Sequence, residues 1–184
     1  TGIWQTVWLE AVSVTHIKRF EAIPDLRNGA VRLKVYVENP GDGMEVTAVA
    51  MADGVEAGRM SISGVGTLVE STLTVANPRL WTPADPFLYD LLLTVKHDGS
   101  VVDEVNSYFG MRSVEIKGRA VLINGQALFQ RLVLDQGFYP DGIWTAPAED
   151  ALKKDILLSQ AAGFNGARLH QKVFEPRFLY WADK

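Results

Sequence analysis

Apolar and polar residues alternate along most of the first 112 positions, which is typical of strands that bury one face. The predicted strands are residues 9–14, 31–38, 46–51, 59–62, 67–75, 87–96 and 101–108. The cluster at 39–43 combines Asn, Pro, Gly and Asp and predicts a turn, and Asp98-Gly99 between two apolar runs predicts a hairpin. About seven short strands with regular turns predict an antiparallel β-sandwich of immunoglobulin-like architecture, so the fold class is mainly β.

After Arg112 the pattern changes to alternating strands and helices. Residues 121–126 predict a small hairpin, 127–134 an apolar strand, 148–162 a helix, and 166–170 a second strand, with another helix from about 175. Acidic residues open the first helix and Gly163 follows it, as expected for a helix start and stop. This order implies parallel strands with a right-handed crossover. We expect two βα units of a truncated (β/α) barrel, because a complete barrel needs about 250 residues.

Composition narrows the possible classes. The chain is 47% hydrophobic, which excludes disorder, and no run approaches the ~18 apolar residues of a membrane span. A net charge of −4 disfavours nucleic-acid partners. The chain has no cysteine, and its three histidines lack ligand spacing, so we expect no metal site and no cofactor. We expect a soluble protein, and cytoplasm, periplasm and secretion all fit this composition.

Both ends of the chain are unusual for natural termini. It begins TGIW without Met and ends YWADK within an aromatic stretch, whereas termini are usually polar and loosely held. We therefore expect that the sequence is a piece of a longer protein.

Three stretches together resemble glycoside hydrolase family 2. GIWQTVWLE at 2–10 resembles the closing strand of that family's jelly-roll sugar-binding domain, and LWTPADPFLYDL at 80–91 resembles a signature of its immunoglobulin-like domain. YFGMRSVEI at 108–116, followed by LING at 122–125, resembles its entry into the catalytic barrel. The resemblance implies three parts: 1–10 the last strand of a preceding jelly roll, 11–112 the sandwich, and 113–184 the start of a TIM barrel.

The resemblance also implies a chemistry. Family 2 enzymes are retaining hydrolases of β-glycosides that use two glutamates, whose carboxyls lie about 5–5.5 Å apart in retaining enzymes. Both glutamates, the acid/base and the nucleophile, lie on later barrel strands, so we expect them beyond Lys184 and expect this chain to serve as scaffold. Glu149 and Glu175 are expected to begin helices on the outside of the barrel, so we assign neither a catalytic role. The implied partner of the parent protein is a carbohydrate substrate, and a homo-oligomer stays open.

A second hypothesis is that the chain belongs to a protein without enzymatic activity. The sandwich is then a non-catalytic carbohydrate-binding or spacer module, and the C-terminal part is a packed appendage.

Candidate substrate-binding residues lie where the two barrel strands end, because barrel active sites form at the carboxyl ends of strands. They are Asp135, Gln136, Tyr139 and Trp144 after the first strand, and Arg168, His170 and Gln171 at the second. By resemblance, Arg168 matches an active-site Arg that holds a carboxylate, and a structural ion pair is the alternative. The resemblance places Gln171, not His170, at the family's His, so His170 either touches substrate or packs against the neighbouring loop.

The aromatic residues divide into two groups. Tyr139 and Trp144 either stack on substrate or pack within their loop. Trp81 and Tyr89 are expected in the sandwich core. Trp4 and Trp8 are expected on one face of a strand, in a core or at a domain contact.

Overall fold

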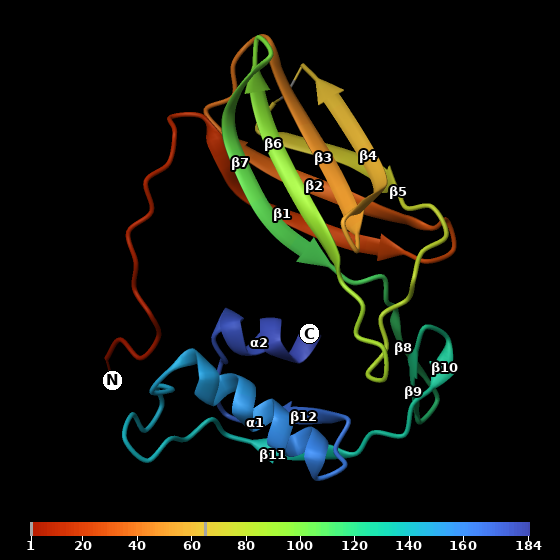
Figure 1. The fold of residues 1–184 in the computed structure, drawn as a ribbon, viewed down its shortest axis with the longest axis vertical. Helices are drawn as coiled ribbons and strands as arrows, with labels where there is room; N and C mark the ends of the chain where they lie inside the picture. The colour runs from red at the N-terminus through yellow and green to blue at the C-terminus, as the bar shows by residue number, and fades with distance from the viewer. Residues whose placement is uncertain (1, 65) are drawn as a thin grey trace. The chain divides into compact units, whose positions relative to one another are not determined.

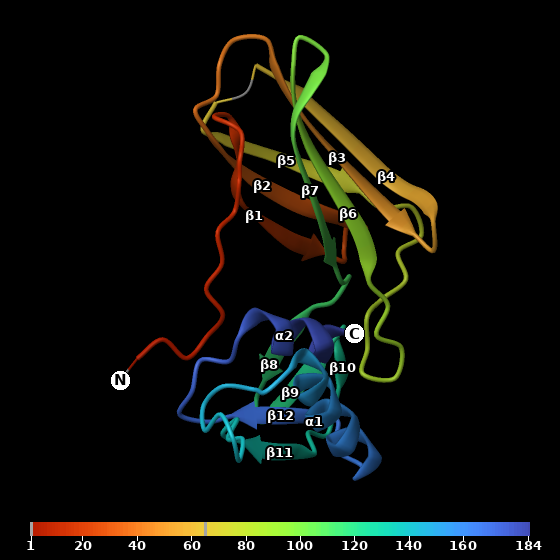
Figure 2. The same cartoon turned by 60° about the vertical axis from the view of Figure 1, so that its left-hand side comes forward.

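The computed structural model describes residues 2–64 and 66–184, which form two compact units. The sandwich unit comprises residues 10–115 and 123–125, and the βα unit comprises residues 2–9, 116–122 and 126–184. Figures 1 and 2 show the strands of the sandwich unit and the helices and strands of the βα unit from two directions.

The sandwich unit contains seven strands in two antiparallel sheets, among the residues described. They are β1 (His16–Asp25), β2 (Ala30–Glu38), β3 (Met44–Ala52), β4 (Val55–Ser63), β5 (Leu68–Thr74), β6 (Tyr89–His97) and β7 (Ser100–Phe109). One sheet has the order β1-β2-β5 and the other the order β4-β3-β6-β7. The predicted mainly-β sandwich is confirmed.

Alternating side chains of these strands form one core. Val31, Leu33 and Val35 of β2 are fully buried or nearly so, as are Val46 of β3 and Leu93 of β6. Each such side chain contributes about 1.5–3 kcal/mol by leaving water. The period of two read from the sequence is therefore the period of burial in the sheets.

The turn predictions also hold. Asp98 and Gly99 join β6 to β7 with φ of 48° and 81°. Two successive positive φ values are those of a type I′ hairpin, whose twist matches the flanking strands. Asn39, in the 39–43 turn, also adopts a positive φ.

The strand predicted at residues 9–14 is wrong, because these residues form none. The first strand is instead β1, which pairs with β2 from His16↔Glu38 to Asp25↔Ala30. A strand needs a partner, and the alternation at 9–14 has none. β1 lies at a sheet edge. Charged residues and Pro24 are tolerated there, and they hide the strand from pattern analysis.

The βα unit is built around two parallel strands. β11 (Leu132–Asp135) pairs with β12 (Gly166–Leu169), and α1 (Glu149–Ala161) connects them; α2 (Pro176–Asp183) follows. Gly163 ends the helix with φ +88°, as predicted. The strand expected over 127–134 is shorter, because only four residues of β11 find a partner in β12. Leu152, Phe174 and Phe178 form the small core of this unit.

Shorter elements complete the chain. β8 (Val114–Lys117), β9 (Ala120–Ile123) and β10 (Gln126–Ala127) form a three-stranded sheet of order β10-β9-β8. Residues 2–10 form no strand, and their assignment to a preceding jelly roll stays a prediction. Neither helix in the described part of the chain is long and apolar enough to cross a membrane.

Candidate functional site

The carboxyl ends of β11 and β12 lie side by side in the βα unit. Asp135 is opposite Leu169 in the register, and the backbone N–H of His170 donates to the carbonyl of Asp135 at 2.8 Å. Parallel pairing therefore brings together the residues that the sequence placed after each strand.

Three polar residues from the two strand ends form one cluster. The amide nitrogen of Gln136 lies 2.9 Å from Nδ1 of His170. This contact joins the side chain that follows β11 to the side chain that follows β12. Asp135 accepts the backbone N–H of Gly137 at 2.7 Å, which orients its half-buried carboxylate. The cluster offers donors and acceptors of the kind that bind hydroxyl groups.

Tyr139 belongs to the loop between β11 and α1. Its hydroxyl donates to Asp155 of α1 at 2.7 Å, and burial together with this bond raises the pKa of Tyr139, so the phenol stays protonated at neutral pH. Its backbone exchanges two 2.9 Å hydrogen bonds with Ile143, which adopts φ 55°. A β-branched residue in the left-handed region is strained, so the surrounding loop holds this turn in place.

Trp144 lies in the same loop, and 38% of its surface is exposed. Its ring contacts Phe138 and Trp4 edge-on, at centroid distances of 5.6 and 6.0 Å. Part of the ring is therefore packed and part is open to a ligand.

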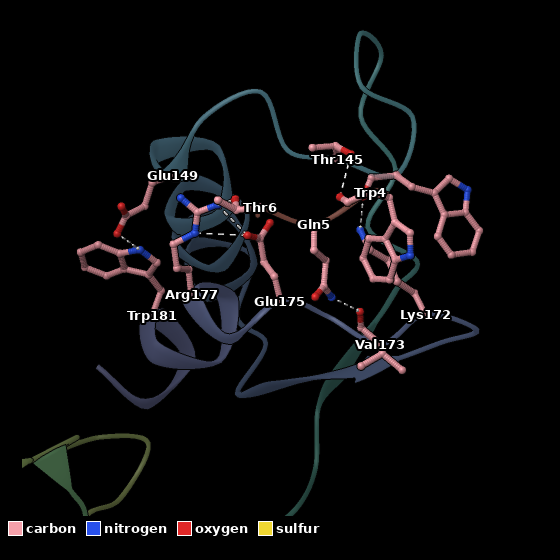
Figure 3. Close-up of polar contacts among 11 residues, drawn as sticks. Trp4, Gln5, Thr6, Thr145, Glu149, Lys172, Val173, Glu175, Arg177 and Trp181 are labelled. Carbon is pink, nitrogen blue, oxygen red and sulfur yellow. Dashed lines mark hydrogen bonds and ion pairs between the residues drawn. The ribbon is translucent and has the colours of Figure 1, made fainter. Parts of the chain in front are cut away.

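Residues 2–9 belong to the same unit and form hydrogen bonds to the segments that contain Trp144 and Lys172 (Figure 3). The carbonyl of Trp4 accepts from Thr145, and the side chain of Gln5 donates to the carbonyl of Val173. Trp8 is 68% exposed. Trp4 and Trp8 therefore do not share the face of a strand, because no strand forms here to alternate their side chains.

Two candidates stand apart from the cluster. Arg168 is exposed within β12, opposite Leu134, and its side chain makes no hydrogen bond or ion pair with any residue in the described ranges. Its role, as a carboxylate-binding group or as part of a structural ion pair, stays a prediction. Gln171 is exposed and has φ 56°.

The two glutamates at the helix starts, Glu149 and Glu175, each bind another side chain of this chain. Glu149 accepts from the indole N–H of Trp181 at 3.1 Å, and Glu175 pairs with Arg177 at 2.7 Å. Figure 3 shows both contacts. Neither carboxylate belongs to the cluster at the strand ends.

Lys184 caps the end of α2. Its backbone N–H donates to the carbonyl of Tyr180 at 3.1 Å, and its ammonium donates to the hydroxyl of the same residue at 2.7 Å. These contacts belong to the helix end and not to the cluster at the strand ends. The location of both catalytic glutamates beyond Lys184 stays a prediction.

Lys172 is the residue that sequence analysis missed. Its ammonium donates to the carbonyls of Gly137 and Trp144, both at 2.8 Å. The pKa of Lys172 is lowered from its ordinary value because the ammonium is partly buried. The nearby carboxylates of Asp135 and Glu175 act in the opposite direction and offset part of this shift. The available signal was a lysine in an aromatic-rich stretch directly after the second strand.

The aromatic residues of the sandwich unit occupy two environments. Tyr89 is buried, stacks on Phe109 at 5.1 Å, and accepts the backbone N–H of Arg79 through its hydroxyl. The core prediction is confirmed for Tyr89. Trp81 is half-buried, with the Arg112 guanidinium 4.5 Å from its ring centroid.

Metal binding gains no support from the described part of the chain. Within residues 2–64 and 66–184, no group of three or more His, Asp or Glu side chains is placed to hold a metal ion.

Comparison with known proteins places this geometry in context. The profile of glycosyl hydrolases family 2 matches residues 15–112. A β-galactosidase of Aeromonas hydrophila is 29% identical over 201 residues, which cover 100% of this chain and 19% of that protein. A β-galactosidase of Lactococcus lactis is 33% identical over 62% of this chain and 12% of its own length. The chain thus spans less than a fifth of these relatives.

Solved structures share the fold at lower identity. A β-glucuronidase from Ruminococcus gnavus, in complex with an N1-substituted uronic isofagomine, superposes with a TM-score of 0.80 at 20% identity, covering 94% of this chain and 29% of that one. A glycosyl hydrolase family 2 member from Bacteroides cellulosilyticus superposes with a TM-score of 0.84 at 19% identity, covering 94% and 26%.

Proposed function

Because the chain belongs to glycosyl hydrolase family 2, we propose that it is part of a retaining glycoside hydrolase acting on β-glycosides. The observation that carries the proposal is the cluster of Asp135, Gln136 and His170 at the shared carboxyl end of two parallel strands. In (β/α) barrels the active site occupies this end.

We assign the sandwich as an immunoglobulin-like scaffold and residues 113–184 as the first part of the catalytic barrel. Residues 1–10 are assigned to the end of a preceding sugar-binding domain. The parallel β11–α1–β12 arrangement supports the barrel assignment, because a crossover helix between parallel strands is the repeating unit of that fold.

The chain itself supplies substrate contacts, and the catalytic glutamates of the parent follow Lys184. Retaining hydrolysis needs two carboxyl groups about 5–5.5 Å apart. Glu149 and Glu175 are instead held at helix starts by an indole and a guanidinium. The polar cluster suits sugar hydroxyls, Trp144 offers a partly exposed ring, and the exposed fork of Arg168 suits a carboxylate.

Activity assays on two proteins test this proposal. The full-length protein and the 184-residue chain would be assayed separately with nitrophenyl β-galactoside and β-glucuronide. We expect hydrolysis by the full-length protein alone, with retention of anomeric configuration. Enzyme-like turnover by the short chain, or inversion by the full-length protein, would contradict it.

The binding-module hypothesis has its own test. In calorimetric titrations of the 184-residue chain with the same sugars, a spacer gives no heat and a binding module gives saturable heat. Saturable binding to the sandwich by a full-length protein without hydrolytic activity would replace the enzyme proposal.

A further inference from the structure

Lys172 is a half-buried cation that contacts other segments of the βα unit. It comes from the loop after β12, its ammonium bonds to the loop after β11, and the ring of Trp4 from the N-terminal segment lies 5.4 Å away (Figure 3). We propose that Lys172 is a positioning residue that holds the loop of residues 137–144 in its sugar-binding geometry. This inference rests on the proposed function, because it concerns the same site.

The two carbonyls that accept from Lys172 lie far apart along this loop. Gly137 and Trp144 are the two ends of the loop, and Tyr139 lies between them. One ammonium that bonds both carbonyls fixes the distance between those ends. Hydrogen bonds from a charged donor are about twice as strong as neutral ones, so a single side chain is sufficient for this closure.

The absence of a side chain at Gly137 leaves space for the ammonium. Gly137 is buried and has φ +63°, and a Cβ built there would lie 2.6 Å from Nζ of Lys172 and 3.1 Å from a ring carbon of Phe174. A side chain at position 137 would therefore clash with the ammonium and force it to move.

Three aromatic rings lie near the ammonium. The rings of Phe174, Trp4 and Tyr139 have their centroids 5.0, 5.4 and 5.9 Å from Nζ. Their faces attract a cation, which adds to the two bonds that the ammonium makes to the carbonyls. Tyr139 thus contacts the cation that helps to position it.

The N-terminal segment holds this arrangement from outside. Thr145, which follows the loop, donates to the carbonyl of Trp4 at 2.8 Å, and Gln5 donates to the carbonyl of Val173 at 3.2 Å. These two bonds lie one residue beyond Trp144 and one residue beyond Lys172. The N-terminal segment therefore bonds both to the loop after β11 and to the loop after β12, which contains Lys172.

Two lysine variants of the full-length protein test the proposal. Lys172→Met keeps the length and apolar stem but removes the donors. Lys153→Met is the matched control, because Lys153 lies 4.5 Å from the ring centroid of Trp181 but bonds no loop carbonyl. Hydrogen exchange of the backbone amides of residues 138–145 reports the loop directly, and amides of α1 report the fold.

We expect at least tenfold faster exchange of the loop in Lys172→Met, with α1 unchanged, and no change in Lys153→Met. The KM for the aryl glycoside should rise about tenfold while kcat stays within about threefold. Unchanged loop exchange, or faster exchange with an unchanged KM, would overturn the proposal. An inactive wild-type protein would instead refute the proposed function, and the exchange measurement would still report on the lysine.

A second pair of variants reports on the same contact without removing the lysine. Gly137→Ala displaces the ammonium, whereas Gly163→Ala carries a similar backbone strain at φ +88° with nothing within 4 Å of its Cβ. Loop exchange should accelerate only in Gly137→Ala. Equal effects of the two variants would attribute the change to backbone strain and overturn the role of Lys172.

Discussion

Gly58 of β4 offers a sharp test of how the two sheets of the sandwich meet. Its Cα lies so close to β5 that an added Cβ would stand 2.1 Å from the carbonyl oxygen of Thr74 and 3.0 Å from a methyl carbon of Leu73. Its φ lies outside the left-handed region, so alanine suits the backbone there. The effect of Gly58→Ala therefore comes from contact alone.

The cost can be worked from these distances. The Cβ and the Thr74 oxygen must separate by about 1.3 Å, from 2.1 Å to the 3.4 Å at which ordinary contact begins. Such overpacking costs about 1–3 kcal/mol. The movement also stretches the 3.2 Å hydrogen bond from Ala76 to Ala57, worth about 1 kcal/mol. Alanine returns roughly 0.4–1 kcal/mol through the unfolded state, so the net loss is about 2 kcal/mol.

Native-state hydrogen exchange measures this loss within the sandwich alone. The amides of Val46 and Leu93, at fully buried positions, report its global opening. A loss of about 2 kcal/mol accelerates their exchange roughly 30-fold. Gly66→Ala is the control, because nothing lies within 4 Å of its Cβ and its φ is ordinary. If both variants exchange at the wild-type rate, the close approach of β4 and β5 is not as described.

Three further changes probe single contacts. Tyr89→Phe removes the hydroxyl that accepts the backbone N–H of Arg79 at 2.7 Å, and should cost the sandwich about 1 kcal/mol in urea denaturation. The hydrogen bond from Arg79 lowers the pKa of Asp85 below 3.8, so its stabilisation is present above that pH and lost as pH falls further. Asp85→Asn should therefore flatten the loss of stability below about pH 4, seen as urea midpoints that depend less on pH. Tyr139→Phe removes the bond to Asp155 and should destabilise α1 by about 1 kcal/mol, measured by exchange of its amides.

Local signals predicted most of the sandwich. Alternation located six of its seven strands, and Asp98-Gly99 located the hairpin of β6 and β7, because these patterns and turns act over a few residues. β1 was missed because its pairing with the next strand, β2, and not its own pattern, makes it a strand. The apolar run 127–134 was read as one strand, but pairing with β12 limits it to four residues.

The candidate site also contains residues that the sequence could identify and residues that it could not. Asp135, Gln136 and His170 could be grouped in advance, because parallel strands place their carboxyl ends at one edge whatever the loops do. The contacts of Lys172 and Trp4 could not, since the bond between Thr145 and Trp4 spans 141 positions and that between Gln5 and Val173 spans 168. No periodicity links residues so distant. The residues that bind a sugar can therefore be proposed from strand order, whereas those that hold the binding loop in place emerge only from the folded chain.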